Sequence, residues 1–150
     1  MSLKEEVDTL RAIPLFSKIE PAKLKLLAFT SQRLSYAIGE ELCRQGEPGD
    51  SAYIILDGEA EVAIDTPTGR IRVAKVARND VIGEIAILCD VPRTATVTAT
   101  KPLEALRIDK DTFFRLVNEF PQMAVEIMRE LARRLDRTNQ QLRAAVAKAS

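Results

Sequence analysis

The chain has 150 residues, the usual size of one domain built around one core. Hydrophobic residues make up 46% of it, which supports a packed core and argues against a disordered chain. Lysine plus arginine and aspartate plus glutamate each number 22, so the formal net charge is zero. That balance provides no overall field to steer the chain onto DNA or an acidic membrane, although it leaves room for a local basic patch.

The sequence contains no histidine, which excludes histidine acid–base catalysis, serine–histidine triads and histidine metal sites. Cys43 and Cys89 form no Cys-x-x-Cys pair, so we expect two reduced, half-buried thiols rather than a disulfide. No apolar run approaches the ~20 residues that span a bilayer. The charged start of the chain lacks the apolar centre of a signal peptide. These features predict a soluble, cytoplasmic protein.

Two short helices are predicted at the N-terminus, one that Pro14 ends and one that begins at Pro21, because proline suits the first helical position. Their apolar faces carry Leu3, Val7 and Leu10 in the first helix and Leu24, Leu27 and Ala28 in the second.

From about residue 33 to residue 108 the hydrophobic pattern changes to period two, which indicates strands. Residues 53–56 form one predicted strand and residues 59–64 the next. The Asp57-Gly58 pair between them is a strong signal for a tight hairpin.

A second turn is predicted at Thr66-Pro67-Thr68-Gly69, followed by a strand over residues 70–76. The clearest alternation is in residues 94–100, where small apolar residues and threonines take opposite faces. Many short strands joined by regular turns predict an antiparallel barrel or sandwich.

Two helices are predicted after the strands. Asp109 is suited to cap a short helix, and Pro121 opens a long one. The organisation is therefore a single domain, 1–150, with N-terminal helices in 1–30, strands in 31–109 and C-terminal helices in 110–147. The short helix carries Phe113, Leu116 and Val117, and the apolar stripe of the long helix is Ala124, Ile127, Met128, Leu131, Leu135 and Leu142.

Residues 81–97 hold the side chains that are best suited to bind a ligand. Gly83 permits a tight turn and the close approach of a ligand. Residues 84–88 can form one helical turn whose free N–H groups point at an anion. Residues 90–92 turn the chain back, so that Arg93 enters the following strand.

Arg93 and Glu84 can meet one ligand from two directions. A guanidinium offers paired donors to phosphate oxygens, whereas a carboxylate repels phosphate and suits a sugar hydroxyl. A 3′,5′-cyclic nucleotide presents both groups close together, and its single charge needs no metal. The alternative is that Glu84 and Arg93 pair on the surface, a contact worth only ~0–1 kcal/mol.

The same segment resembles the phosphate-binding cassette of cyclic nucleotide-binding domains. That family includes the bacterial catabolite activator protein, protein kinase A regulatory subunits and cyclic nucleotide-regulated channels. The resemblance covers about residues 10–142. The matching stretches are Gly83-Glu84-Ile85-Ala86-Ile87, Pro92-Arg93-Thr94-Ala95-Thr96-Val97, Arg44 to Asp50, Tyr53 to Gly58, and Leu15-Phe16.

The resemblance implies an eight-stranded antiparallel β-roll, jelly-roll-like, with N-terminal helices and a C-terminal helix pair. It implies that Glu84 takes the ribose 2′-hydroxyl and that Arg93 takes the cyclic phosphate. The Thr94 hydroxyl and the backbone amides of residues 85 and 86 would help to bind the phosphate. The sequence departs from the family at Ile82, where an aromatic residue is common. The implied ligand-binding residues are therefore Gly83, Glu84, Ile85, Ala86, Arg93 and Thr94.

The function that follows is a non-enzymatic sensor domain for cAMP, with cGMP as the second ligand because Thr94 suits a guanine amino group. The C-terminal helices would swing toward the ligand and cap its base. An equally weighted alternative is that their polar residues form a solvated helix face. The long helix either packs on the barrel or pairs in a homodimer, with Thr138 interrupting its stripe. The candidate base contacts are Arg133, Arg134, Arg137 and Asn139.

Four alternatives compete with this one. A transcription factor needs a recognition helix pair, and residues 144–150 are too few for one, so we expect no DNA binding by this chain alone. The chain could instead be the sensor fragment of a larger channel, kinase or regulator, with an unknown output partner. An enzyme would need a metal cluster or a poised base. A degenerate roll without a ligand would have no reason to keep both Glu84 and Arg93.

Overall fold

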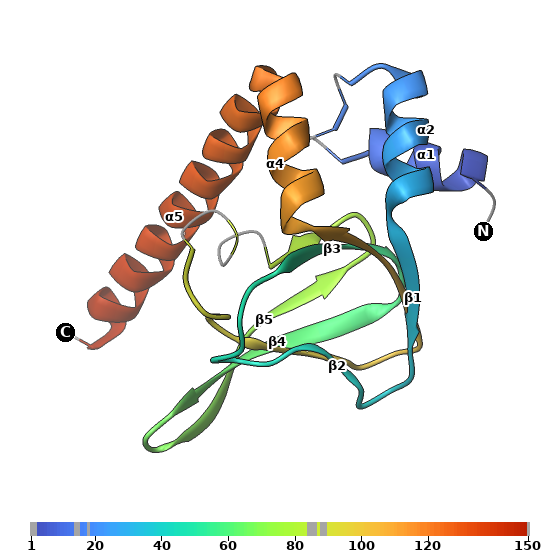
Figure 1. The fold of residues 1–150 in the computed structure, drawn as a ribbon. Helices are drawn as coiled ribbons and strands as arrows, with labels where there is room; N and C mark the ends of the chain where they lie inside the picture. The colour runs from blue at the N-terminus through green and yellow to red at the C-terminus, as the bar shows by residue number, and fades with distance from the viewer. Residues whose placement is uncertain (1–2, 14–15, 18, 84–86, 88–89, 150) are drawn as a thin grey trace.

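Eight antiparallel strands form two four-stranded sheets that face each other as a β-roll, with helices before and after them (Figure 1). The computed structural model describes residues 3–13, 16–17, 19–83, 87 and 90–149. One sheet has the order β1-β8-β3-β6 and the other β2-β7-β4-β5. The roll expected from the sequence is therefore confirmed. The strands are β1 (Gln32–Tyr36), β2 (Glu41–Cys43), β3 (Ser51–Asp57), β4 (Glu59–Thr66), β5 (Gly69–Ala77), β6 (Val81–Ile82), β7 (Thr96–Ala99) and β8 (Leu103–Asp109).

The helices begin where the sequence predicts. Pro21 opens the second helix, and the Asp109 side chain accepts a hydrogen bond of 2.8 Å from the backbone N–H of Thr112. That cap lowers the pKa of Asp109. Pro14, the predicted end of the first helix, lies outside the described residues. The helices are α1 (Leu3–Arg11), α2 (Pro21–Thr30), α4 (Lys110–Glu119) and α5 (Pro121–Ala149).

Strand β3 separates two apolar clusters, because its side chains alternate between the two faces of a sheet that is covered on both sides. Ile54 and Leu56 belong to the cluster between the roll and the helices. Tyr53 and Ile55 belong to the cluster inside the roll. This double burial explains why β3 reads as a continuous apolar run.

The predicted hairpin at Asp57-Gly58 is wrong. Strand β3 pairs with β6 and β8, whereas β4 pairs with β5 and β7, so the dipeptide is a corner between the two sheets. Gly58 has a φ of +97°, and a Cβ there would collide with the carbonyl of Pro102. A glycine with a left-handed backbone conformation allows a sharp bend, but it does not decide whether the flanking strands pair with each other.

The second predicted turn is a true hairpin. Thr66 pairs with Gly69, and its hydroxyl donates a 2.6 Å hydrogen bond to the Gly69 carbonyl. The β4–β5 hairpin extends from the body of the roll, and β5 forms the edge of its sheet (Figure 1). Strand β7 is shorter than the alternation over 94–100 suggests.

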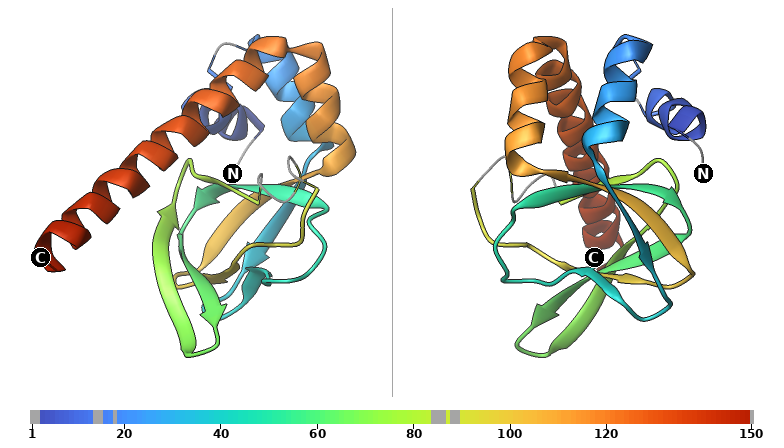
Figure 2. Two further views of the ribbon diagram at one scale, coloured as in Figure 1. Left: turned by 90° about the vertical axis from the view of Figure 1, so that its left-hand side faces the viewer. Right: turned by 45° about the vertical axis from the view of Figure 1, so that its right-hand side comes forward.

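Helix α5 is anchored at its start, passes beside the roll and diverges from it toward the C-terminus (Figure 2). Ile127 is buried and Leu131 packs against the same cluster. Met128, Leu135 and Leu142 are 61%, 62% and 62% exposed, so the predicted stripe divides into a packed part and an exposed part. Within the described residues, no helix has the length and apolar character needed to cross a membrane.

Candidate functional site

A cavity of about 520 Å³ lies between the roll and α5. Gly83, Arg93 and Thr94 of the predicted site are among its lining residues. The other three predicted site residues, Glu84, Ile85 and Ala86, lie outside the described residues. The described walls come from β2, β4, β5, β6, β7, the segments next to β6 and before β7, and α5.

The loop over residues 44–50 fixes the backbone at Arg93. The N–H of Arg93 donates to the carbonyl of Glu47 at 2.8 Å, and the N–H of Gly46 donates to the carbonyl of Arg93 at 2.9 Å. These bonds place Arg93 just before β7 and not within it. Asp90, with a φ of 51°, makes the preceding turn that the sequence predicts over residues 90–92.

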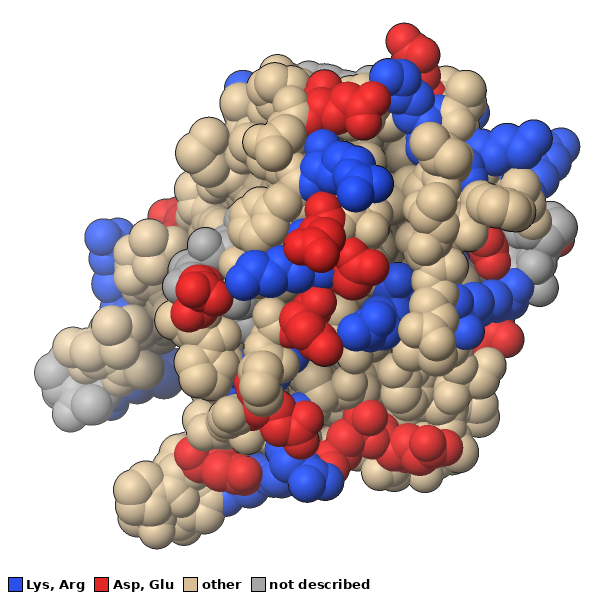
Figure 3. Space-filling view, in the orientation of Figure 1, with Lys and Arg blue, Asp and Glu red and all other residues tan. Residues whose placement is uncertain are grey.

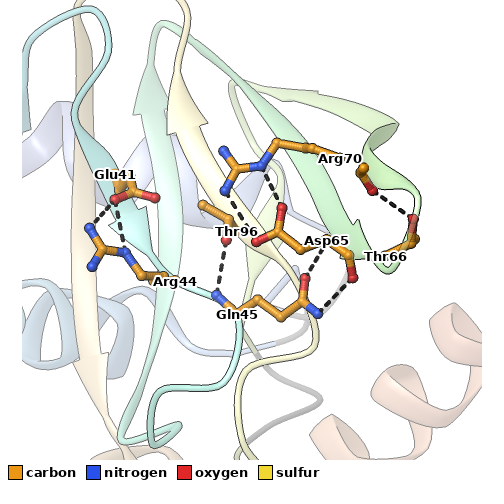
Figure 4. Close-up of polar contacts among 8 residues, drawn as sticks. Glu41, Arg44, Gln45, Asp65, Thr66, Arg70 and Thr96 are labelled. Carbon is orange, nitrogen blue, oxygen red and sulfur yellow. Dashed lines mark hydrogen bonds and ion pairs between the residues drawn. The ribbon is translucent and has the colours of Figure 1, made fainter.

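Gln45 ties this loop to both neighbouring strands (Figure 4). Its backbone N–H donates to the hydroxyl of the buried Thr96 at 3.0 Å. Its side-chain oxygen accepts the N–H of Asp65 at 2.7 Å, and its amide donates to the Asp65 carbonyl at 3.3 Å. The loop that positions Arg93 is therefore fixed to β4 and β7.

The Arg93 side chain is buried, and the residue is only 5% exposed. Nη1 donates to the carbonyl of Gly83 at 3.2 Å, and Nη2 donates to the hydroxyl of Ser51 at 3.3 Å. Its Cζ atom lies 5.8 Å from the centre of the Tyr53 ring, within cation–π range. Neutral oxygens and a ring face thus hold the guanidinium in one orientation at the cavity wall.

Asp50 extends this network toward helix α4. Its carboxylate accepts from the Ser51 hydroxyl at 3.0 Å and lies 3.8 Å from Nη2 of Arg93. Arg107 donates to the other carboxylate oxygen at 3.3 Å, and the Asp50 carbonyl accepts the N–H of Lys110, the first residue of α4, at 2.9 Å. The side chain of Asp50 is 69% exposed, so solvent screens its attraction to Arg93.

Sequence reasoning did not identify Ser51 or the role of Asp50. Asp50 is the last residue of the Arg44–Asp50 stretch that resembles the family, and Ser51 follows it directly, so the available signal was their position at the end of that stretch.

The interior of the roll beneath Arg93 is neutral. Burial, and then the neighbouring Tyr53, raise the pKa of Tyr36 to about 12. Burial also raises the pKa of the Cys43 thiol, which lines the cavity. Cys43 is a free cysteine, as expected, and Cys89 lies outside the described residues. Valines of β4, β5 and β7 complete an apolar wall, which suits a nucleobase, beside the buried guanidinium of Arg93.

Helix α5 supplies the opposite wall through a row at helical spacing, i, i+3, i+4 and i+7. Arg134 and Arg137, two of the four candidate base contacts, line the cavity, whereas Arg133 and Asn139 are not among its described lining residues. Sequence reasoning missed the other two members of this row. The full row is Arg134, Arg137, Thr138 and Gln141.

The Thr138 hydroxyl donates to the carbonyl of Arg134 at 2.9 Å. Its proton is used in that bond, so the oxygen presents acceptor lone pairs to other groups. In the described residues no group of three acidic or cysteine side chains could hold a metal ion.

Both the backbone conformation and the close packing at position 83 favour glycine. Its φ is +87°, and a Cβ there would collide with Nη1 of Arg93. The carbonyl of Ser51 would lie 3.0 Å from the same atom. Gly83 therefore allows the guanidinium to lie against the backbone.

We expect Gly83→Ala to destabilise the protein more than Gly39→Ala, measured as the free energy of unfolding in urea. Gly39 has a φ of +91° with nothing within 4 Å of its Cβ, so its substitution costs only backbone strain, about 1–2 kcal/mol. The collision with Arg93 should add about 1 kcal/mol or more. Equal losses in the two variants would contradict this close approach.

Comparisons with known proteins agree with this geometry. Residues 33–120 match the family model described as "Cyclic nucleotide-binding domain". The chain is 31% identical over 129 residues to the "CRP-like cAMP-activated global transcriptional regulator" of Mycobacterium tuberculosis, covering 85% of this chain and 58% of that protein. It is 34% identical over 123 residues to a "cAMP-dependent protein kinase regulatory subunit" of Dictyostelium discoideum, covering 79% of this chain and 36% of that protein.

A solved structure is similar over most of the fold. The catabolite activator protein of Thermus thermophilus superposes with a TM-score of 0.78 at 25% identity, covering 86% of this chain and 61% of that one. The chain thus spans a little over half the length of its bacterial relatives. The family model matches more than half of the chain and includes the buried Arg93, and the chain belongs to the cyclic nucleotide-binding domain family.

Proposed function

We propose that this chain is a non-enzymatic sensor domain that binds a 3′,5′-cyclic nucleotide, cAMP in preference to cGMP, and relays occupancy through its C-terminal helices. The observation that carries the proposal is the buried guanidinium of Arg93 at the cavity wall. The guanidinium donates hydrogen bonds to neutral oxygens of Gly83 and Ser51. A singly charged cyclic phosphate would compensate that buried cation without a metal.

The rest of the ligand would follow from this anchor. Thr94 lines the cavity beside Arg93 and would assist with the phosphate. Glu84 would take the ribose 2′-hydroxyl, and the amides of Ile85 and Ala86 would point at the phosphate. These three roles remain predictions from the sequence. The base would then lie against the valine wall, between the roll and α5.

The names of two relatives support a regulatory role. One is called a cAMP-activated transcriptional regulator and the other a regulatory subunit of a cAMP-dependent kinase. The output partner of this chain is not specified by these names. Acidic and basic side chains alternate on the face drawn in Figure 3, which offers nucleic acid no basic patch there.

Thr138 supports the preference for cAMP. Its oxygen can accept a hydrogen bond but its proton is used by the Arg134 carbonyl. Adenine carries an amino donor at position 6, where guanine carries a carbonyl acceptor. A cGMP molecule would need a different contact, and Thr94 is the candidate for its amino group.

The relay would begin at the hydrogen-bonded network that joins Arg93, Ser51 and Asp50. A phosphate bound next to Arg93 would weaken the ion pair between Arg93 and Asp50. The backbone carbonyl of Asp50 accepts a hydrogen bond from the first residue of α4, so a change at Asp50 would reach that helix. Asp90, in the turn before Arg93, forms a 3.1 Å ion pair with Lys110 of α4. Both links join the cavity to the helices that follow the roll.

Arg93→Ala should weaken cAMP binding a hundredfold or more in calorimetry, because an unpaired buried charge costs about 3–5 kcal/mol. Glu84→Ala should cost less, since water can replace part of a hydroxyl contact. The matched control is Arg70→Ala on the exposed β4–β5 hairpin, where Arg70 pairs with Asp65.

Equal affinity in wild type and Arg93→Ala would contradict the site assignment. A wild-type protein that binds neither cAMP nor cGMP would identify the domain as a roll that has lost its ligand. Disappearance of cAMP on incubation with the pure protein would establish an enzyme instead.

Thr138→Val should lower the affinity for cAMP about two- to tenfold, the effect of one neutral hydrogen bond of about 0.5–1.5 kcal/mol, and leave that for cGMP nearly unchanged. Thr138→Ser keeps the hydroxyl and serves as the control. Competition binding with both nucleotides measures the ratio of the affinity for cAMP to the affinity for cGMP. An unchanged ratio in Thr138→Val would remove Thr138 from base selection.

Saturating cAMP should slow amide hydrogen exchange in α5 between residues 132 and 141, because a ligand between the two walls restricts this part of the helix. Exchange in α1, which lies outside the cavity, serves as the internal control. Unchanged exchange across α5 would exclude a lid role for this helix.

A further inference from the structure

The two walls of the cavity carry charges of the same sign. Lys75 of β5 and Arg93 lie on the side of the roll, whereas Arg134 and Arg137 lie on α5. Among the described lining residues, Asp80 is the acidic one. Basic side chains on both walls therefore outnumber the carboxylate that shares the cavity with them.

Lys75 keeps a positive environment in spite of its ion pair. Its Nζ atom lies 2.9 Å from one carboxylate oxygen of Glu59, and Nζ of Lys101 lies 3.4 Å from the other oxygen. The hydrogen bond from Lys75 is the main cause of a lowered pKa of Glu59. One carboxylate shared by two ammonium groups leaves this trio with a net positive charge, and Lys75 is its member among the described lining residues.

The α5 wall adds donors at helical spacing. Arg134, Arg137 and Gln141 follow one another at i, i+3 and i+7, which places them on one face of the helix, and all three line the cavity. The nearest acidic residue along the helix is Asp136, which accepts a hydrogen bond from Gln140 at 3.1 Å. Asp136 is not among the described lining residues, so the face toward the cavity is basic.

A single cyclic phosphate does not balance the charges that line this cavity. In the proposed function the phosphate binds Arg93, and Glu84 faces the sugar. Four basic lining residues against the carboxylates of Asp80 and Glu84 leave two positive charges, of which the phosphate compensates one. Like charges on opposite walls repel each other, whereas an anion between the walls attracts both.

We propose that Lys75, Arg134 and Arg137 form a second anion subsite, which takes a second phosphate group while the first phosphate binds Arg93. A guanidinium donates paired hydrogen bonds to phosphate oxygens, and a lysine supplies a point charge. The second phosphate belongs either to the same ligand, as in a cyclic dinucleotide, or to a free phosphate ion bound beside a cyclic mononucleotide. The inference rests on the proposed function for the first phosphate alone.

A contact to the base is the other role for the α5 arginines. A purine offers them ring-nitrogen and carbonyl acceptors, which are neutral. Such a contact would satisfy hydrogen bonds, but it would leave the positive charges of the two walls facing each other. The charge on both walls therefore favours an anion between Lys75 and Arg137.

Calorimetry on the full chain tests both sources of the second phosphate at constant ionic strength. Cyclic di-AMP should bind wild type about tenfold or more tightly than cAMP, the effect of one added charge-assisted contact. In the second arm, inorganic phosphate replaces chloride during a cAMP titration. It should raise the affinity for cAMP about fivefold or more, because both anions pull the same two walls together.

Arg137→Gln is the test variant, and Arg143→Gln is its matched control. Arg143 is an exposed residue of α5 outside the described cavity lining, so the control removes the same charge from the same helix. Arg137→Gln should abolish most of the gain in either arm. It should leave the affinity for cAMP alone within about twofold, since solvent screens an exposed guanidinium that has no phosphate beside it. Arg143→Gln should keep the gain.

A gain with cyclic di-AMP alone would identify one ligand with two phosphates, and a gain with inorganic phosphate alone would identify a separate ion. The absence of a gain in both arms would overturn the subsite. An equal loss of affinity for cAMP and cyclic di-AMP in Arg137→Gln would also overturn it, because a base contact serves both ligands. Failure to bind cAMP would contradict the proposed function, whereas binding of cyclic di-AMP that Arg137→Gln weakens would still support the subsite.

Discussion

The burial of the Arg93 guanidinium constrains the whole site. A buried cation is costly unless surrounding groups compensate it, and here the carbonyl of Gly83 and the hydroxyl of Ser51 do so in part. This arrangement requires a glycine at position 83, a buried serine at the start of β3 and a fixed backbone at Arg93 itself. The fold provides these through a loop bonded to two strands.

The two-core architecture explains how a small domain can hold such a site. Strand β3 is covered on both faces, with the helices on one side and the roll interior on the other. Its start carries Ser51 and Tyr53, both in contact with Arg93. A strand that is packed on both faces is difficult to displace, so the β3 residues that contact the guanidinium hold it in a fixed position.

The two faces of helix α5 have different surroundings. The face with Thr138 and Gln141 lines the cavity, and the face with Leu135 and Leu142 is exposed. The neutral interior around Tyr36 and Cys43 keeps further charge away from the buried cation, because burial favours the protonated form of both groups.

The sequence by itself determined the family and the starts of the helices at Pro21, Asp109 and Pro121, and it identified Arg93 as a candidate ligand-binding residue, because these depend on local chemistry. Only the tertiary structure decided that Asp57-Gly58 joins two sheets, since period-two alternation indicates a strand but not its partner. It also decided which α5 residues face the cavity. Helical periodicity gives the possible faces, but the packing of Ile127 and Leu131 on the core sets how the helix is rotated.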